Sequence, residues 1–121
     1  MGAYVSIRGW LQCDERQLVA IQEIISAYED GHYTDGWGTP RRHVNWIHYV
    51  FYGADIRESS LGWFTDQLRE IARIPPSDGD LDLVRGLFIA GHETDGTTEW
   101  QVRDGQLFIT PADIRHEYLG T

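Results

Sequence analysis

Hydrophobic and polar residues alternate along the first segment of the chain, residues 4–13. Val5, Ile7 and Leu11 share one side of this segment. The other side carries a mixed set of residues: Tyr4, Ser6, Arg8, Trp10 and Gln12. Alternation with a period of two is typical of a β-strand that has one buried face. The pattern therefore predicts a half-buried strand at the start of the chain.

Two segments carry apolar residues at the three- and four-residue spacing of an amphipathic helix. The first, residues 18–28, follows Asp14 and Gln17, which together match a capping box at a helix N-terminus. The second begins at residues 59–60 and ends before the prolines at 75–76, because proline cannot continue the helical hydrogen-bond ladder. We therefore predict two helices.

The rest of the chain reads as strands and turns. The dipeptides Asp95-Gly96 and Asp104-Gly105 predict two hairpin turns, since both tolerate the positive φ angles that such turns require. The segments between the turns and helices are rich in β-branched and aromatic residues. We predict four further strands, at residues 44–52, 84–93, 98–103 and 106–110. The tail from Pro111 is expected to be a short helix or an irregular cap.

The predicted order of elements is β-α-β-α-β-β-β. A strand, a crossover helix and a second strand normally place the two strands parallel, whereas two short hairpins produce an antiparallel meander. Two helices with one apolar stripe each can cover one face of a sheet. We therefore expect an α+β fold, a two-layer α/β sandwich in which a mixed five-stranded sheet carries both helices on one face. The other face is left partly open.

The open face is expected to mix aromatic, Arg and acidic side chains. From the first strand it takes Tyr4, Arg8 and Trp10. On the second strand we assign to it the more polar alternate set, which is Trp46, His48 and Tyr52, and to the core Ile47, Tyr49 and Phe51. The later strands add Glu99, Gln101, Arg103 and Gln106. Aromatic and Arg residues are enriched at binding hot spots, so this face binds a partner, lies under loops or the tail, or forms a homodimer.

Composition adds a strong negative charge to this picture. The 121 residues, which suit a single domain spanning residues 1–121, include 19 acidic and 10 basic side chains and have a net charge of -9. This balance argues against direct binding of nucleic acid and against docking on an anionic membrane. It favours a cationic partner. Neither a signal peptide nor an apolar stretch of ~20 residues is present, so we expect a cytoplasmic protein.

The acidic residues gather in two blocks, residues 14–35 and 78–104. Six acidic residues face one Arg in the first block and seven face two in the second, so each has a net charge of -5. Turn chemistry explains some of these acids but not the scarcity of basic residues among them. We expect a partner to contact the acids of the second block: Asp78, Asp80, Asp82, Glu93, Asp95, Glu99 and Asp104. Trp37, or Trp10 and Trp46, would supply a packing anchor.

No motif commits the chain to catalysis or metal binding. Cys13 lies beside two acidic residues, which disfavour a reactive thiolate. His43 and His48 are five residues apart on a predicted strand, so they point to opposite faces. The run Asp78-x-Asp80-x-Asp82 lacks the glycine and glutamate of a calcium loop. We therefore expect no catalytic residue, no metal site and no cofactor.

One alternative is a small enzyme that acts on a polar metabolite in an aromatic-lined cleft. His48 or His92 would be its acid–base group, with Tyr49 or Tyr52 nearby. This alternative requires an enclosed pocket with converging polar groups.

Four stretches of the chain carry a resemblance to a known family. They are YVSIRGWLQC, DGHYTDGWG, NWIHYVFYG, and GLFIAGHE together with TEWQVRDG. With these stretches the chain, over residues 3–110, resembles the immunity proteins of bacterial polymorphic toxin systems, including those that accompany contact-dependent growth-inhibition toxins. The resemblance implies a small α/β protein that binds and blocks a cognate toxin C-terminal domain made in the same cell. It assigns no binding residue. The acidity suits a nuclease toxin with a cationic substrate groove.

Overall fold

A computed structural model describes residues 3–42, 44 and 46–120. Its elements, with η for a 3-10 helix, are β1 (Tyr4–Cys13), α1 (Glu15–Ala27), η1 (Tyr33–Gly36), β2 (Trp37–Gly38), β3 (His48–Arg57), η2 (Glu58–Ser60), α2 (Leu61–Ala72), β4 (Arg85–His92), β5 (Gly96–Arg103), β6 (Gln106–Pro111) and η3 (Ile114–Leu119). Among these residues no helix is long and apolar enough to cross a membrane.

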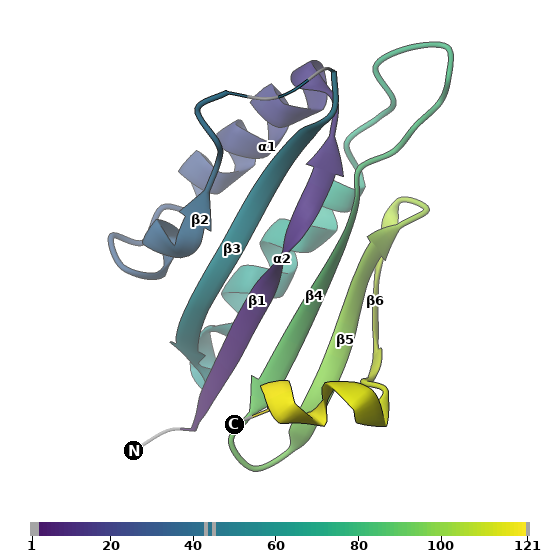
Figure 1. Cartoon of the computed structure of the whole chain (residues 1–121). Helices are drawn as coiled ribbons and strands as arrows, with labels where there is room; N and C mark the ends of the chain where they lie inside the picture. Colours follow the sequence, from purple (N-terminus) through teal and green to yellow (C-terminus); the bar gives the residue numbers. More distant parts are fainter. Residues whose placement is uncertain (1–2, 43, 45, 121) are drawn as a thin grey trace.

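The six strands of the described residues form one sheet in the order β2-β3-β1-β4-β5-β6, and α1 and α2 both cover the same face (Figure 1). The α+β class and the two α-helices on one face are therefore as predicted. The predicted mixed sheet of five strands is wrong, because every neighbouring pair is antiparallel and β2 adds a short sixth strand.

The predicted parallel pairing of the first two long strands is also wrong. β1 and β3 are antiparallel neighbours, with Tyr4 opposite Arg57 and Cys13 opposite His48. After α1 the chain passes along the sheet once more, pairs briefly as β2 with β3, and returns to the end where β1 finished (Figure 1). β3 therefore starts at that end and runs opposite to β1. The expectation that two strands joined by a helix lie parallel holds when the chain enters the second strand directly from the helix.

The helices bury their apolar stripes against the inward side of the central strands. Among the core residues that are fully buried, the largest are Phe64, Phe88, Ile7, Leu11, Ile21, Ile56, Leu68 and Ile71. The capping box predicted at the start of α1 is confirmed. The Gln17 backbone N–H donates to the Asp14 carboxylate at 2.8 Å, and the Gln17 side chain accepts from the Asp14 N–H at 3.0 Å.

β3 faces the opposite way from our prediction. Val50, Tyr52 and Ile56 are buried against the helices, whereas Tyr49 and Phe51 are exposed on the open side. His48 shares the inward parity of Tyr52. The hydroxyl of Tyr52 donates to the Tyr33 carbonyl at 2.8 Å, and this hydrogen bond allows a tyrosine in the core. The strand also begins later than predicted, so Trp46 precedes it rather than lying on the sheet.

Close contact between β1 and β4 depends on Gly9. A Cβ at this position would overlap the Leu87 carbonyl oxygen and lie 2.6 Å from the Phe88 Cα. Both atoms belong to the backbone of the neighbouring strand, so a side chain there would force the two strands apart. By contrast, a Cβ on Gly53, on the other neighbour of β1, would meet nothing within 4 Å.

We predict that Gly9→Ala lowers the free energy of unfolding by at least ~2 kcal/mol, because the strands must separate to accept the methyl group. Urea unfolding followed by tryptophan fluorescence measures the change. The matched control is Gly53→Ala, which should leave the stability unchanged or raise it by up to about 1 kcal/mol. Equal effects of the two substitutions would contradict this account of the β1–β4 contact.

Candidate functional site

A row of mostly aromatic and apolar side chains crosses the open face of the sheet. The strand registers place Phe51, Trp10, Leu87, Gln101 and Phe108 opposite one another, from β3 across to β6. We call these five residues the aromatic row. Trp10 is 41% exposed and Phe51 47% exposed. Large aromatic side chains that remain accessible on a rigid sheet are the type that anchors protein interfaces.

The C-terminal helix η3 covers the other end of this face, beside the β4–β5 hairpin (Figure 1). The Arg8 guanidinium donates to the Leu119 carbonyl at 2.7 Å, and the Ala112 N–H donates to the Thr97 carbonyl at 3.0 Å. The tail lies so close to β4 that a Cβ on Gly91 would be 2.9 Å from the Leu119 oxygen. The tail therefore covers part of the face and leaves the aromatic row open.

An open groove with a volume of about 810 Å³ lies next to Trp10, between β1, β4, β5 and the loop that precedes β4. It carries three carboxylates and two guanidiniums on its walls, which are Asp82, Glu99, Asp104, Arg85 and Arg103. It joins the aromatic row through Trp10, Leu87 and Gln101. The groove and the row together form one continuous surface, which we call the groove end of the open face.

Both guanidiniums of the groove are already paired. Arg85 lies 3.8 Å from Asp82, and Arg103 lies 2.7 Å from Asp104. Glu99 instead accepts from the Gln101 side-chain amide at 2.6 Å, and none of the ion pairs between described residues includes it. The groove therefore has one carboxylate in excess, which favours a cationic group from outside.

The seven acids predicted to meet a partner lie in three places. Asp82, Glu99 and Asp104 line the groove. Asp78 and Asp80 lie on the adjoining loop, where the Asp80 N–H donates to the Asp78 carboxylate at 3.0 Å in a local turn. The remaining two, Glu93 and Asp95, follow β4 at the opposite end of the sheet. β4 is eight residues long, or roughly 25 Å, so the seven acids do not form one patch.

The three predicted tryptophan anchors also occupy different places. Trp10 lies on the aromatic row. Trp46 is 77% exposed and borders a separate hollow with Asp78. Trp37 lies on the helix side of the sheet, where its ring stacks on Phe64 at a centroid distance of 5.4 Å. Among these three, Trp10 alone belongs to the groove end.

Sequence reasoning missed Phe51 and Tyr49 as members of the open face, because it assigned the wrong parity to β3. A signal for the correct parity lies further along the strand. Asp55 and Arg57 have the same parity as Phe51, whereas Ile56 has the parity of Tyr52. Continuing the alternation past Tyr52 would therefore have placed the polar ends of the strand, and Phe51 with them, on the solvent side.

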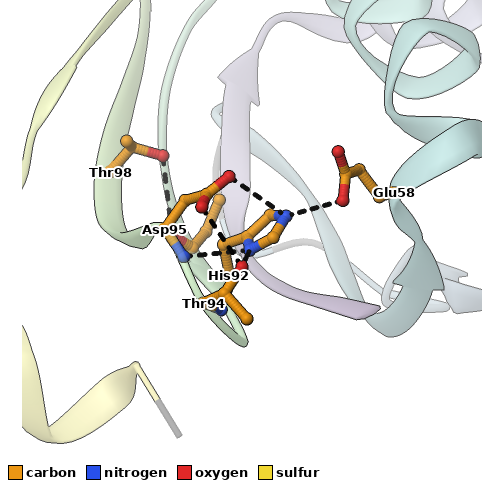
Figure 2. A network of polar contacts seen from close by, with 6 residues as sticks. Glu58, His92, Thr94, Asp95 and Thr98 are labelled. Carbon is orange, nitrogen blue, oxygen red and sulfur yellow. Dashed lines mark hydrogen bonds and ion pairs between the residues drawn. The ribbon is translucent and has the colours of Figure 1, made fainter. Parts of the chain in front are cut away.

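His92 joins the β4–β5 hairpin to the segment before α2 (Figure 2). Its Nδ1 accepts from the backbone N–H groups of Thr94 and Asp95, each at 3.1 Å. Its Nε2 lies 3.0 Å from a Glu58 carboxylate oxygen and 3.6 Å from an Asp95 oxygen. Because Nδ1 accepts hydrogen bonds, the proton of the neutral ring is on Nε2 and is donated to Glu58. Both ring nitrogens are thus engaged in holding the hairpin.

The acid–base pairs considered for an enzyme are not brought together. His92 lies opposite Val5 and Tyr52 lies opposite Gly9, four residues apart along β1 or roughly 13 Å. Tyr49 has the opposite parity to both His48 and His92, and Tyr52 lies four residues from His48 along β3, again roughly 13 Å. Burial raises the pKa of Tyr52 above its usual range.

The thiol and the metal candidates likewise form no reactive site. Burial, and to a lesser extent Asp14, raises the pKa of Cys13 from 9.0 to about 12. His43 lies outside the described residues. In the part of the chain that the structure describes, no group of three or more His, Cys, Asp and Glu residues could hold a metal ion.

We predict that His92 and Glu58 are energetically coupled, because the His92 Nε2–H donates to a carboxylate while Nδ1 is already occupied. A double-mutant cycle with His92→Ala and Glu58→Ala should give a coupling of about 1–2 kcal/mol in urea unfolding at pH 7. The control cycle is Arg69→Ala with Asp66→Ala, an exposed pair 3.5 Å apart on α2 that should give less than ~0.5 kcal/mol. Equal couplings would contradict a specific role for the His92 network.

The groove end thus combines an accessible tryptophan, a neighbouring phenylalanine and an excess carboxylate on a rigid sheet. This arrangement can hold a cationic, partly apolar surface, and it contains no assembled catalytic group among the described residues. Comparisons of this chain with protein-family models, with curated proteins and with solved structures find no match.

Proposed function

We propose that the protein is an immunity protein that binds a cognate bacterial toxin domain and neutralises it by covering the active site or substrate groove. The observation that carries the proposal is the groove end of the open face, where Trp10 adjoins a groove with three carboxylates. The resemblance of the sequence to immunity proteins supplies the class of partner. The site of action is the cytoplasm of the cell that makes both proteins.

Electrostatics favours a cationic nuclease as the toxin. A nuclease binds phosphate groups through Arg and Lys side chains, so its substrate groove is positive. Glu99, which belongs to none of the ion pairs between described residues, would occupy the place of a phosphate in such a groove, with Asp82 and Asp104 beside it. The net charge of -9 adds long-range attraction, which raises the association rate toward ~10⁸–10⁹ M⁻¹s⁻¹ at low salt. Fast capture protects the cell when the toxin is lethal at low concentration.

The aromatic row would control how long the complex lasts. Side chains at the centre of an interface that lose all contact with water contribute most to affinity, and tryptophan is the residue most often found there. Trp10 lies in the middle of the open part of the face, with Phe51 and Leu87 on its two sides. We therefore assign the slow dissociation of the complex to Trp10 and its neighbours.

The direct test is co-expression with the C-terminal domain encoded by the reading frame immediately upstream. The proposal predicts a stable complex on co-purification and rescue of growth when that domain is toxic. A toxic domain that is neither bound nor neutralised would contradict the proposal and favour the enzyme alternative.

We predict that neutralising the groove acids slows association. The variant Asp82→Asn, Glu99→Gln, Asp104→Asn introduces asparagine at position 104, because φ is 53° there and asparagine tolerates this angle, whereas most other residues would strain the turn. Its association rate with the toxin domain should fall by roughly tenfold at low salt, and the difference should shrink as salt is raised. Stopped-flow mixing measures the rate.

The control for this experiment removes the same charge elsewhere. Glu23→Gln, Asp35→Asn, Glu93→Gln changes three acids that lie outside the groove, and it should alter the rate by less than about twofold. A control variant as slow as the groove variant would mean that net charge alone, and not the groove, steers the encounter.

We predict that Trp10→Ala increases the dissociation rate roughly 30-fold, which corresponds to about 2 kcal/mol, because the anchor of the interface is lost. Surface plasmon resonance measures this rate. Trp46→Ala is the matched control, since Trp46 is more exposed but lies away from the row, and it should change the rate by less than about threefold. A larger effect of Trp46→Ala than of Trp10→Ala would indicate that the interface lies at the hollow beside Asp78.

A further inference from the structure

The two edges of the sheet differ in a way that points to a second interaction. At one edge β2 is two residues long. At the other, β6 has six residues, pairs with β5 alone among the described strands, and has no element beyond it (Figure 1). Proteins normally protect such an edge with charged residues, a bulge or an internal proline. β6 contains neither a charged residue nor a bulge, and its proline, Pro111, is the last residue of the strand.

The side chains of β6 are also suited to contact. Ile109 is 45% exposed, and Leu107 packs partly against the core. On the open side, the Phe108 ring lies under the Arg103 guanidinium at 4.3 Å. Residues 105–112 carry no charge in a chain whose net charge is -9. This strand is therefore a place where two copies of the chain can approach with little repulsion.

We propose that β6 pairs in antiparallel fashion with β6 of a second copy, about a two-fold axis at Phe108. In an antiparallel pair, directly opposed residues point to the same face of the sheet. Two copies of one strand related by a two-fold axis meet this condition only when one residue lies opposite its own copy, so the axis passes at that residue. With the axis at Phe108, this residue meets the partner's Phe108. Leu107 then lies opposite the partner's Ile109, and Gln106 lies opposite the partner's Thr110. Each pair joins side chains of like polarity.

Neighbouring registers match less well. An axis at Leu107 would place Phe108 opposite the partner's Gln106 and Ile109 opposite the partner's Gly105, so both large side chains would lose an apolar partner. An axis at Ile109 would place Phe108 opposite the partner's Thr110 and Leu107 opposite the partner's Pro111. An aromatic ring would then face a hydroxyl group, and a proline without an N–H would sit inside the ladder instead of at its end. The sequence of β6 thus selects the register centred on Phe108.

Charges at the ends of the strand fit the same arrangement. The Arg103–Asp104 ion pair precedes β6, and the Asp113–Arg115 pair, at 3.8 Å, follows it. Antiparallel pairing brings the first ion pair of one copy beside the second of the other. Charges of both signs therefore meet at each end, and the aromatic row of each copy continues toward that of its partner through Phe108.

The test uses the chain alone, so its outcome is independent of the proposed toxin. Size-exclusion chromatography with light scattering should give twice the monomer mass of 13.9 kDa at high micromolar concentration. Ile109→Lys should restore the monomer mass, because it adds a charge to the paired edge. Val19→Lys, which changes a 53% exposed residue on α1 in the same way, should remain a dimer.

Cysteine cross-linking tests the register. Phe108→Cys should form a covalent dimer on mild oxidation, because the two residues face each other across the axis. Thr110→Cys, on the same face but more than roughly 13 Å from its copy, should not. Cys13 is buried and does not compete. A monomer at all concentrations, a dimer that survives Ile109→Lys, or preferential cross-linking of Thr110→Cys would overturn the proposal, as would capture of a toxin strand at β6 by a monomer.

Discussion

The double pairing of β1 is the constraint on which the rest of this structure depends. β1 lies in the middle of the sheet, antiparallel to β3 on one side and to β4 on the other. Its inward residues Val5, Ile7 and Leu11 are buried against both helices. Gly9 allows β4 to approach closely enough for the Phe88 ring to enter the core. The outward residues of the same strand then have fixed positions, so one strand determines both the core and the open face.

Two outward residues of β1 divide the open face into a covered part and a free part. Arg8 holds the C-terminal tail through the Leu119 carbonyl, whereas Trp10, two residues along, remains accessible. A rigid strand presents Trp10 without the loss of conformational freedom that a loop would suffer on binding. The loop before β4 and the β5–β6 turn add carboxylates beside it. The proposed function follows from this division, since the free part is both apolar and acidic.

Local features of this fold were predictable from the sequence, and long-range ones were not. The capping box of α1 and the turn at Asp104-Gly105, with φ angles of 53° and 74°, depend on residues close together in the chain. The parity of β3 is also a local feature, which Asp55, Ile56 and Arg57 indicate once the alternation is followed to the end of the strand. The direction of β3, by contrast, depends on the long connection after α1, in which β2 is too short to show any periodicity. The same holds for the site, because Glu93 follows Asp82 by only eleven positions but lies at the opposite end of β4.

The central claim is that the free part of the open face, and not the helix face, is where a partner binds. The indole N–H signals of the tryptophans test it most directly, because Trp10 lies on the open face while Trp37 and Trp100 pack on the helix side. In an NMR titration with the toxin domain, this account predicts that the Trp10 indole signal shifts or broadens while the Trp37 and Trp100 signals stay in place. An unchanged Trp10 signal, with shifts at Trp37 or Trp100, would contradict it.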